Sequence, residues 1–317
     1  MHKAITVLIP TRNSALFIGE SLQSIETESA VAEILVLDSA SSDGTLEIAK
    51  KYSKVRVVQC GDMGISEALN SSKSHIGTKY AARMDADDIS RNNRFSLQLN
   101  FLIAGDYDLV GSDIVYHGKN SWYLNYIKNR HFTVANLNAM FIYKSPIVHP
   151  TWLMKSELLY TIHYRNQLAE DYDFLVRAKM AGAKLGILNE ELLLYRLNPN
   201  QVSKSKRAVL LSSSNDVSNS YISWYTSALD ASFDQRLKNS FFRTSYSSVN
   251  QLISDFEHIR THCGNLFSNQ HLKEIFFRLV FRLTRREGNS EIFKFMKKEF
   301  GLAFSLDMLP LLIRVRT

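Results

Sequence analysis

The sequence lacks the features that mark secreted, disulfide-bonded and membrane-spanning proteins. It has two cysteines, Cys60 and Cys263, which lie far apart and without metal-ligand spacing, so a reducing compartment is the simpler expectation. The first residues run into a short apolar segment that no small-residue cleavage site follows. The late apolar run at 301–315 is interrupted by charged residues and a proline. We therefore expect a cytoplasmic protein without a membrane-spanning helix.

Two common nucleotide-binding motifs are also missing. No Gly-x-Gly-x-x-Gly follows the first apolar segment, and no Gly-Lys-Ser or Gly-Lys-Thr occurs in the chain. Such motifs bind dinucleotides and phosphates because their glycines let backbone N–H groups approach the ligand closely. Their absence disfavours a hydride-transfer enzyme and a P-loop kinase.

The composition is that of an ordinary folded protein with a surplus of basic residues. Of the 317 residues, 45% are hydrophobic and 22% are charged, which suffices for a substantial core. The formal net charge of +7 suggests an anionic partner. That partner could be a nucleotide, a lipid head group or a nucleic acid, and charge alone does not choose among them.

Apolar runs alternate with helical patterns as far as about residue 205. A continuous apolar run at 4–10 and a second buried-strand pattern at 33–38 are typical of strands buried on both faces, and a third strand is expected at 55–59. Each of the three precedes a turn and a helical pattern. A fourth run begins at Tyr80. This order predicts a mostly parallel α/β sheet that binds ligands at the carboxyl ends of its strands. Later strands are expected at 107–115, 152–154, 183–188 and 191–197.

The run from Tyr80 ends in three carboxylates, Asp85, Asp87 and Asp88, within four positions. Carboxylate oxygens gathered at a strand end suit Mg²⁺ or Mn²⁺ bound together with substrate phosphates. Asp is also common in turns and helix caps, so a structural role is the competing interpretation. Asp38, at the end of the second predicted strand, would add to a polar, acidic crevice at the same edge of the sheet.

A second acidic group, 170–173, opens a predicted helix whose buried face begins at Phe174. Acidic residues in a first turn are stabilised by the helix dipole, which is a sufficient structural explanation on its own. Beside the first acidic cluster, a carboxylate here also becomes a candidate general base for an attacking hydroxyl.

Six motifs in a fixed order carry a resemblance that covers about residues 3–205. They are Val7–Asn13, Val36–Asp38 with Ser42–Thr45, Gly64–Asn70, Ala82–Asp88, His149–Thr151 and Ala169–Asp173. Each motif alone is weak, but the ordered set resembles the family 2 inverting glycosyltransferases of the GT-A fold, which build bacterial surface polysaccharides. The resemblance implies a nucleoside-diphosphate sugar as donor, with a UDP-sugar favoured over a GDP- or dTDP-sugar.

The resemblance also implies roles for single residues on the nucleotide side. Pro10, Thr11 and Asn13 resemble the first nucleotide-binding loop, and Asp38 resembles the acid that contacts the base or ribose. The family commonly has two acids and a glycine after the second strand. This chain has Asp38-Ser39-Ala40 there, which weakens any inference about how the base is recognised.

On the catalytic side, Asp87 and Asp88 resemble the DXD site for the metal and the diphosphate, and Asp85 adjoins it. Asp171 resembles the catalytic base that deprotonates the acceptor hydroxyl. Asn198 stands where the family often has a histidine after a Tyr-Arg pair, so a late histidine ligand is not expected. The Gln-x-x-Arg-Trp signature of processive members is absent, which favours the transfer of a single sugar.

The composition changes near residue 206, so we expect a catalytic domain at 1–205 and a helical region at 206–317. Residues 274–300 interleave aromatic and basic side chains. Such basic amphipathic helices can lie on an anionic bilayer, here the inner face of the plasma membrane. The alternative is that the aromatic side chains pack on the catalytic domain while the cations face water.

Three hypotheses about function follow. The first is a glycosyltransferase, hexosyl or N-acetylhexosaminyl, acting on a glycan or lipid-linked saccharide and not on nucleic acid. The second is a metal-dependent nucleotidyltransferase, although residues 11–14 make a poor phosphate loop for that class. The third is a nonenzymatic nucleotide- or glycan-binding module, which the retained acids disfavour.

Overall fold

The protein is described by a computed structural model in which two compact units are distinguished. The first comprises Met1–Ala135 and Lys144–Val217, and the second comprises Asn136–Tyr143 and Ser218–Thr317. The structure describes residues 3–118, 121, 125, 137–141, 145–197, 207–228, 240, 246–263, 276 and 289–300. The sequence also predicts a polar, basic loop at 198–206 and a substrate-facing region at 117–145. All of the first range and most of the second lie outside the described residues.

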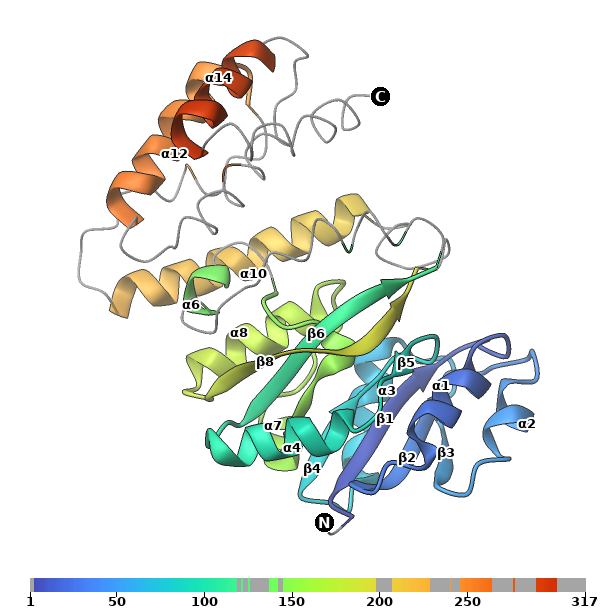
Figure 1. Ribbon diagram of the computed structural model, residues 1–317. Helices are drawn as coiled ribbons and strands as arrows, with labels where there is room; N and C mark the ends of the chain where they lie inside the picture. Colours follow the sequence, from blue (N-terminus) through green and yellow to red (C-terminus); the bar gives the residue numbers. More distant parts are fainter. Residues whose placement is uncertain are drawn as a thin grey trace. The chain divides into compact units, whose positions relative to one another are not determined.

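The first unit is built on one eight-stranded sheet with the order β3-β2-β1-β4-β7-β6-β8-β5 (Figure 1). Its strands are β1 (Ile5–Thr11), β2 (Val31–Asp38), β3 (Val55–Gln59), β4 (Tyr80–Arg83), β5 (Ile89–Ser90), β6 (Leu109–His117), β7 (Leu153–Lys155) and β8 (Leu185–Arg196). Strands β1 to β4 are parallel, β6 and β8 are parallel, and β7 and β5 pair antiparallel with their neighbours. The predicted mostly parallel α/β sheet is therefore confirmed.

Helices cover both faces of this sheet. They are α1 (Ile18–Glu26), α2 (Thr45–Ala49), α3 (Ile65–Ser71), η1 (Ser72–His75), α4 (Arg94–Ala104), η3 (His149–Thr151), α7 (Ser156–Thr161) and α8 (Glu170–Met180). Because side chains alternate along a strand, Ile5, Val7 and Ile9 of β1 share one face and pack in one core with helices α1, α2 and α4. Leu8 is buried on the other face, where α3 contacts β1 and β2.

Two strands differ in extent from the sequence prediction. The run that begins at Tyr80 is a strand only as far as Arg83, and its three carboxylates lie in the turn between β4 and β5. The turn carries the carboxylates out of the hydrogen-bonded sheet, although Asp88 remains buried there. The runs expected at 183–188 and 191–197 form one strand, β8, which shifts its register against β6 near Asp113.

Most of the described part of the second unit is helical. It contains α6 (Leu137–Met140), α12 (Val249–Cys263), α14 (Asn289–Phe300) and the part of α10 (Arg207–Ala228) beyond Val217. Phe256, Phe276 and Phe295 pack ring to ring at 4.9 to 5.9 Å. These three aromatic side chains thus form a core within the second unit. Within the described part of the chain, no helix is long and apolar enough to cross a membrane.

Candidate active site

The carboxyl ends of β1 and β2 meet at a pair of buried polar side chains. Thr11 and Asp38 are partners in the strand register, and both are buried. The Ser41 N–H donates to Asp38 Oδ2 at 3.2 Å. Asp38 Oδ1 and Thr11 Oγ1 have no hydrogen-bond partner among the described residues. Because buried polar atoms are normally paired, these two oxygens are suited to a ligand at this edge of the sheet.

The loops after β1 and β2 are joined through Asn13. Its backbone N–H donates to Ser41 Oγ at 2.9 Å, and its Oδ1 accepts the Ser42 N–H at 2.9 Å. Asn13 has a φ of 50°, a left-handed conformation that asparagine tolerates better than most residues. Its side chain therefore fixes the loop that follows Pro10 and Thr11.

Asp43 holds the same two loops from the other side. It accepts the Ala15 N–H at 3.0 Å, the Thr45 N–H at 3.1 Å and the Thr45 hydroxyl at 2.5 Å. The Thr45 hydroxyl is the main cause that lowers the pKa of Asp43, because the bond stabilises the charged form. The loops on the nucleotide side are thus closed by their own hydrogen bonds.

The acidic turn after β4 lies against a buried arginine, Arg83. The Arg83 guanidinium contacts Asp85 Oδ1 at 2.7 Å through Nη2. Its Nε and Nη1 are buried and have no hydrogen-bond partner in the part of the chain that is described. Asp85 and Asp87 are half-buried, whereas Asp88 is buried. The buried Arg83 guanidinium therefore places a fixed positive charge next to the turn that carries the three carboxylates.

Arg196, the last residue of β8, fixes the conformation of this turn. Its backbone N–H donates to Asp88 Oδ1 at 2.9 Å, and its Nε donates to the Asp87 carbonyl at 2.7 Å. Its Nη2 contacts Glu20 of α1 at 2.6 Å. We did not predict a role for Arg196. The only signal in the sequence was the Tyr-Arg pair that closes the β8 run.

The environment of Asp87 and Asp88 disfavours the charged form of both side chains. Burial, followed by the charge of Asp85, raises the pKa of Asp87 and raises the pKa of Asp88 well above its usual value. Asp88 Oδ2 is buried and has no partner among the residues described. A divalent cation would satisfy this oxygen and favour the charged forms, so the residues present fit a Mg²⁺ or Mn²⁺ ion.

The protein side chains do not form a complete metal site by themselves. No group of three or more His, Cys, Asp or Glu side chains within the described residues could hold a metal ion. Magnesium usually takes one or two carboxylates and completes its shell with water and substrate phosphates. A metal at Asp87 and Asp88 would therefore depend on a phosphate-bearing ligand.

Helix α8 begins with the second acidic group. Glu170 and Asp171 are half-buried in its first turn. Burial, followed by the charge of Asp171, raises the pKa of Glu170 to about 8, and burial also raises the pKa of Asp171. Buried acids whose pKa values are raised are a common source of a general base or acid near neutral pH.

The acidic turn and the start of α8 share one electrostatic environment. The charge of Arg83 lowers the pKa of both Glu170 and Asp171, whereas the charge of Asp85 raises both. Such charge effects require the groups to lie near each other. The charges of Arg83 and Asp85 therefore act on both the acidic turn and the first turn of α8. The sequence pattern had predicted no role for Arg83.

The motif at 149–151 has a structural part in this arrangement. His149 is buried, and burial followed by the charge of Arg83 holds its pKa well below the usual value. Its Nε2 is hydrogen-bonded to the Tyr164 hydroxyl at 2.9 Å. Trp152 and Phe174 pack around the same pair. His149 is thus a neutral core residue beneath the site.

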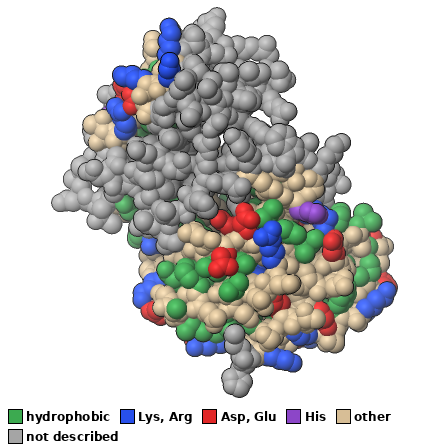
Figure 2. Space-filling model, viewed as in Figure 1, with side chains coloured by type: hydrophobic (Ala, Val, Ile, Leu, Met, Phe, Trp, Pro, Cys, Tyr) green, Lys and Arg blue, Asp and Glu red, His purple; other side chains and the backbone are tan. Residues whose placement is uncertain are grey.

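On the face that Figure 2 shows, the charged side chains of the described residues do not form a patch of one sign. Figure 2 shows acidic and basic side chains interspersed over the described part of the face in view. The local arrangement of buried groups, and not a patch of one sign, therefore identifies the candidate site.

Comparison with known proteins agrees with this geometry. Residues 6–162 match the family model described as Glycosyl transferase family 2. An uncharacterized glycosyltransferase of Methanocaldococcus jannaschii is 28% identical over 221 residues, which are 66% of this chain and 76% of that protein. The O-antigen biosynthesis glycosyltransferase WbnJ of Escherichia coli is 24% identical over 220 residues, 64% of this chain and 84% of that protein.

The fold is also that of a solved structure. The crystal structure of Staphylococcus aureus TarS residues 1–349 in complex with UDP-GlcNAc superposes with a TM-score of 0.55. The match covers 99% of this chain and 87% of that one at 17% identity. At this identity the likeness shows the fold, and the predicted GT-A fold is confirmed.

Proposed function

Because its match to the family model makes this chain a member of glycosyl transferase family 2, we propose that it transfers one sugar from a nucleoside-diphosphate sugar to an acceptor hydroxyl, with inversion at the anomeric carbon. The acceptor is a glycan or a lipid-linked saccharide. The observation that carries the proposal is the convergence of the acidic turn and the first turn of α8 around Arg83.

The donor nucleotide is assigned to the ends of β1 and β2. The unpaired oxygens of Thr11 and Asp38 accept hydrogen bonds from the ribose or the base, and Pro10 and Asn13 shape the loop above them. We favour a UDP-sugar because the TarS structure of the same fold is a complex with UDP-GlcNAc. A hexose or an N-acetylhexosamine is the sugar class.

The diphosphate is assigned to the acidic turn. Asp87 and Asp88 would hold Mg²⁺ or Mn²⁺ together with the phosphates, and Asp85, paired with Arg83, limits the turn's movement. When bound, the cation neutralises charge on the leaving diphosphate. Arg196 keeps Asp88 Oδ1 engaged, so Asp88 Oδ2 is the oxygen that remains for the ligand.

Asp171 is assigned as the general base. Its carboxylate accepts the proton of the acceptor hydroxyl while the hydroxyl oxygen forms a bond to the anomeric carbon. The bond from that carbon to the diphosphate oxygen breaks in the same step, and the nucleoside diphosphate leaves with the electron pair. One displacement inverts the configuration. The raised pKa of Asp171 suits a base that works near neutral pH.

The acceptor places the reaction near a membrane surface. The related WbnJ protein is named for O-antigen biosynthesis, which supports a surface glycan or its lipid-linked precursor. Lys294, Lys297 and Lys298 of α14 are exposed, whereas Ile292 and Phe295 of the same helix are buried. We propose that these cations meet anionic lipids at the inner face of the plasma membrane, while the apolar side chains stay in the helical unit.

Calorimetric titration tests the donor and metal assignments together. UDP-, GDP- and dTDP-sugars are titrated with and without Mn²⁺ into the wild type and Asp88→Asn. We expect metal-dependent binding of a UDP-sugar by the wild type, and at least about a 10-fold loss in the variant, because Asn lacks the charge of the carboxylate. Asn keeps an oxygen for the Arg196 N–H. Undiminished binding by Asp88→Asn with Mn²⁺ would contradict the metal site.

A further inference from the structure

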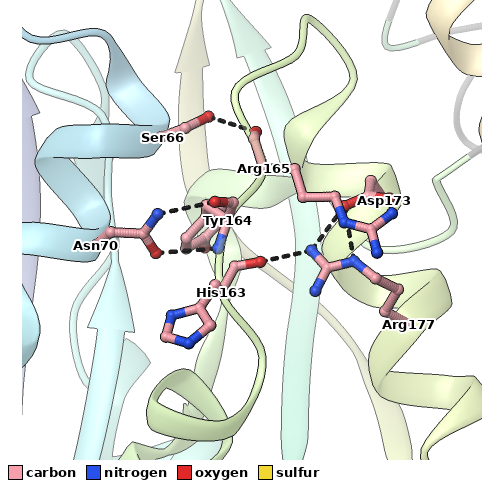
Figure 3. A network of polar contacts seen from close by, with 7 residues as sticks. All are labelled: Ser66, Asn70, His163, Tyr164, Arg165, Asp173 and Arg177. Carbon is pink, nitrogen blue, oxygen red and sulfur yellow. Dashed lines mark hydrogen bonds and ion pairs between the residues drawn. The ribbon is translucent and has the colours of Figure 1, made fainter.

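Two of the six sequence motifs, 64–70 and 149–151, meet at one short segment instead of at the acidic turn. The segment 162–169 connects α7 to α8 and so leads directly to Glu170 and Asp171. Figure 3 shows its first part between α3 and α8. The segment has no regular secondary structure, so side chains from its neighbours must fix its course.

On the α3 side, Asn70 holds the segment by its backbone. The Asn70 Nδ2 donates to the Tyr164 carbonyl at 2.8 Å, and Asn70 Oδ1 accepts the Tyr164 N–H at 3.0 Å (Figure 3). This reciprocal pair imitates the bonding of a neighbouring strand. Ser66, one turn earlier on α3, donates to the Arg165 carbonyl at 3.0 Å. Two consecutive residues are thereby pinned to α3.

On the α8 side, an ion-pair group holds the same segment. Arg177 donates to the His163 carbonyl at 2.6 Å and contacts Asp173 Oδ2 at 2.6 Å. The Arg165 guanidinium reaches Asp173 Oδ1 at 3.4 Å. Asp173 is buried, so its charge is well paired here. Residues 163–165 are therefore held from the α3 side and from the α8 side.

This arrangement sets the rotation of α8 about its axis. Residues two positions apart in an α-helix project about 200° from each other. With Asp173 held toward the segment at 163–165, Asp171 projects to the opposite side of the helix. There the pKa of Asp171 is lowered by the charge of Arg83 and raised by the charge of Asp85.

We propose that Asn70, assisted by Ser66, is a positioning residue that fixes the first turn of α8 and so the placement of Asp171. Only the effect on catalysis rests on the proposed function, in which Asp171 is the general base; the effect on the first turn of α8 does not. The buried Tyr164 side chain completes the brace, because it is hydrogen-bonded to His149 and stacks on Phe174 at 4.7 Å. The motifs at 64–70 and 149–151 thus support the motif at 169–173.

Amide hydrogen exchange tests the brace without any assay of activity. Asn70→Asp keeps an acceptor for the Tyr164 N–H but replaces the donor to the Tyr164 carbonyl by an oxygen. We expect amides at 166–174 to exchange at least about 5-fold faster. Ser66→Ala, which removes one bond, changes the same amides less and provides a second variant should Asn70→Asp fold poorly. Unchanged exchange in both variants would overturn the proposal.

Tyr160→Phe is the matched control. The Tyr160 hydroxyl of α7 donates to the Lys73 carbonyl at 3.0 Å and the Ile76 carbonyl at 3.2 Å. It ties α7 to Lys73 of η1 and to Ile76, and no described hydrogen bond joins Tyr160 to the segment at 163–165. The Lys73 ammonium contacts His163 Nδ1, and this side chain is unchanged in the variant. We expect no faster exchange at 166–174 in this variant. An equal effect in Tyr160→Phe would reduce the role of Asn70 to general stability and overturn the proposal.

The catalytic consequence is read separately, as UDP release from UDP-GlcNAc and as calorimetric binding of UDP with Mn²⁺. A displacement of a base by about 1 Å can cost about 100-fold in rate. We expect Asn70→Asp to lower turnover about 10- to 100-fold and to leave UDP binding unchanged. Faster exchange with full turnover would uphold the brace and count against Asp171 as the base. Loss of UDP binding in parallel with turnover would contradict a role in positioning.

Discussion

The two halves of the candidate site are stabilised in opposite ways. Around the ends of β1 and β2, Asn13 and Asp43 join two loops through hydrogen bonds that need no ligand. Around the acidic turn and α8, carboxylates lie close together, their pKa values are raised, and Asp88 Oδ2 has no partner within the described structure. The loops of the first half are closed by their own hydrogen bonds, although Thr11 Oγ1 and Asp38 Oδ1 still lack partners among the described residues. The acids of the second half need a cation before their charged forms are favoured.

This difference separates a rigid platform from a reactive centre. Loops closed by their own hydrogen bonds present a donor nucleotide with a preformed surface, which lowers the ordering cost of binding. Acids whose charged forms are disfavoured in the free protein are stabilised when a cation and a phosphate bind beside them. Charge-neutralising substitutions should therefore have opposite effects on stability in the two halves, and only those in the second half should abolish transfer.

The largest expected effect is that of Asp171→Asn. The substitution keeps the shape of the side chain but removes the basic oxygen, so we expect transfer to fall by about 10²- to 10⁴-fold. UDP binding with Mn²⁺ should persist, because the acidic turn is unchanged. UDP release from UDP-GlcNAc gives the rate, and calorimetry gives the affinity.

Glu157→Gln provides the control for this variant. Glu157 is an exposed acid in the first turn of α7, so it shares the helix-dipole interaction of Asp171 without lying in the site. We expect Glu157→Gln to retain full transfer. Full turnover by Asp171→Asn would remove Asp171 from the mechanism.

Much of this contrast was predictable because the signals were local. The apolar run to Arg83 and the acids after it are adjacent in sequence, so their place at a strand end followed from pattern alone. The same holds for Asp38 and for the acids that open α8. Sheet class and helix order followed because alternating buried strands and helices have few alternative arrangements.

The partners of these residues were not predictable, because they come from distant parts of the chain. Arg196 reaches Asp88 from 108 positions away, and Asn70 reaches Tyr164 from 94 positions away. Arg83 is buried at the end of an apolar run. Nothing in that run indicated that its charge would act on both acidic groups. Such contacts depend on the register between strands and on the rotation of each helix about its axis. The spacing of residues within one segment predicts neither.

A smaller effect is expected for Asp43→Ala on the nucleotide side. The substitution removes the acceptor of three hydrogen bonds and leaves two backbone N–H groups to water, so we expect a loss of about 1–2 kcal/mol of stability. Because the pKa of Asp43 is lowered in the fold, this contribution is present above about pH 3.8 and is lost as the pH falls below it. Denaturant unfolding at pH 7 and pH 3 measures the difference. A variant as stable as the wild type at pH 7 would contradict a self-supporting loop pair.

The smallest effect should have the opposite sign and comes from Glu170→Gln. Its pKa is raised from 4.5 to about 8, so the folded state holds a proton that the unfolded state releases above pH 4.5. The wild type therefore loses stability as the pH rises from 4.5 to 8, and the glutamine variant, which does not titrate, does not. We expect Glu170→Gln to match the wild type in Tm at pH 5 and to exceed it at pH 8 by a few degrees, since about 1 kcal/mol shifts the Tm of a domain of this size by roughly 2–4 °C. Equal Tm differences at both pH values would show that the second half is as well satisfied as the first, and the contrast between the halves would fail.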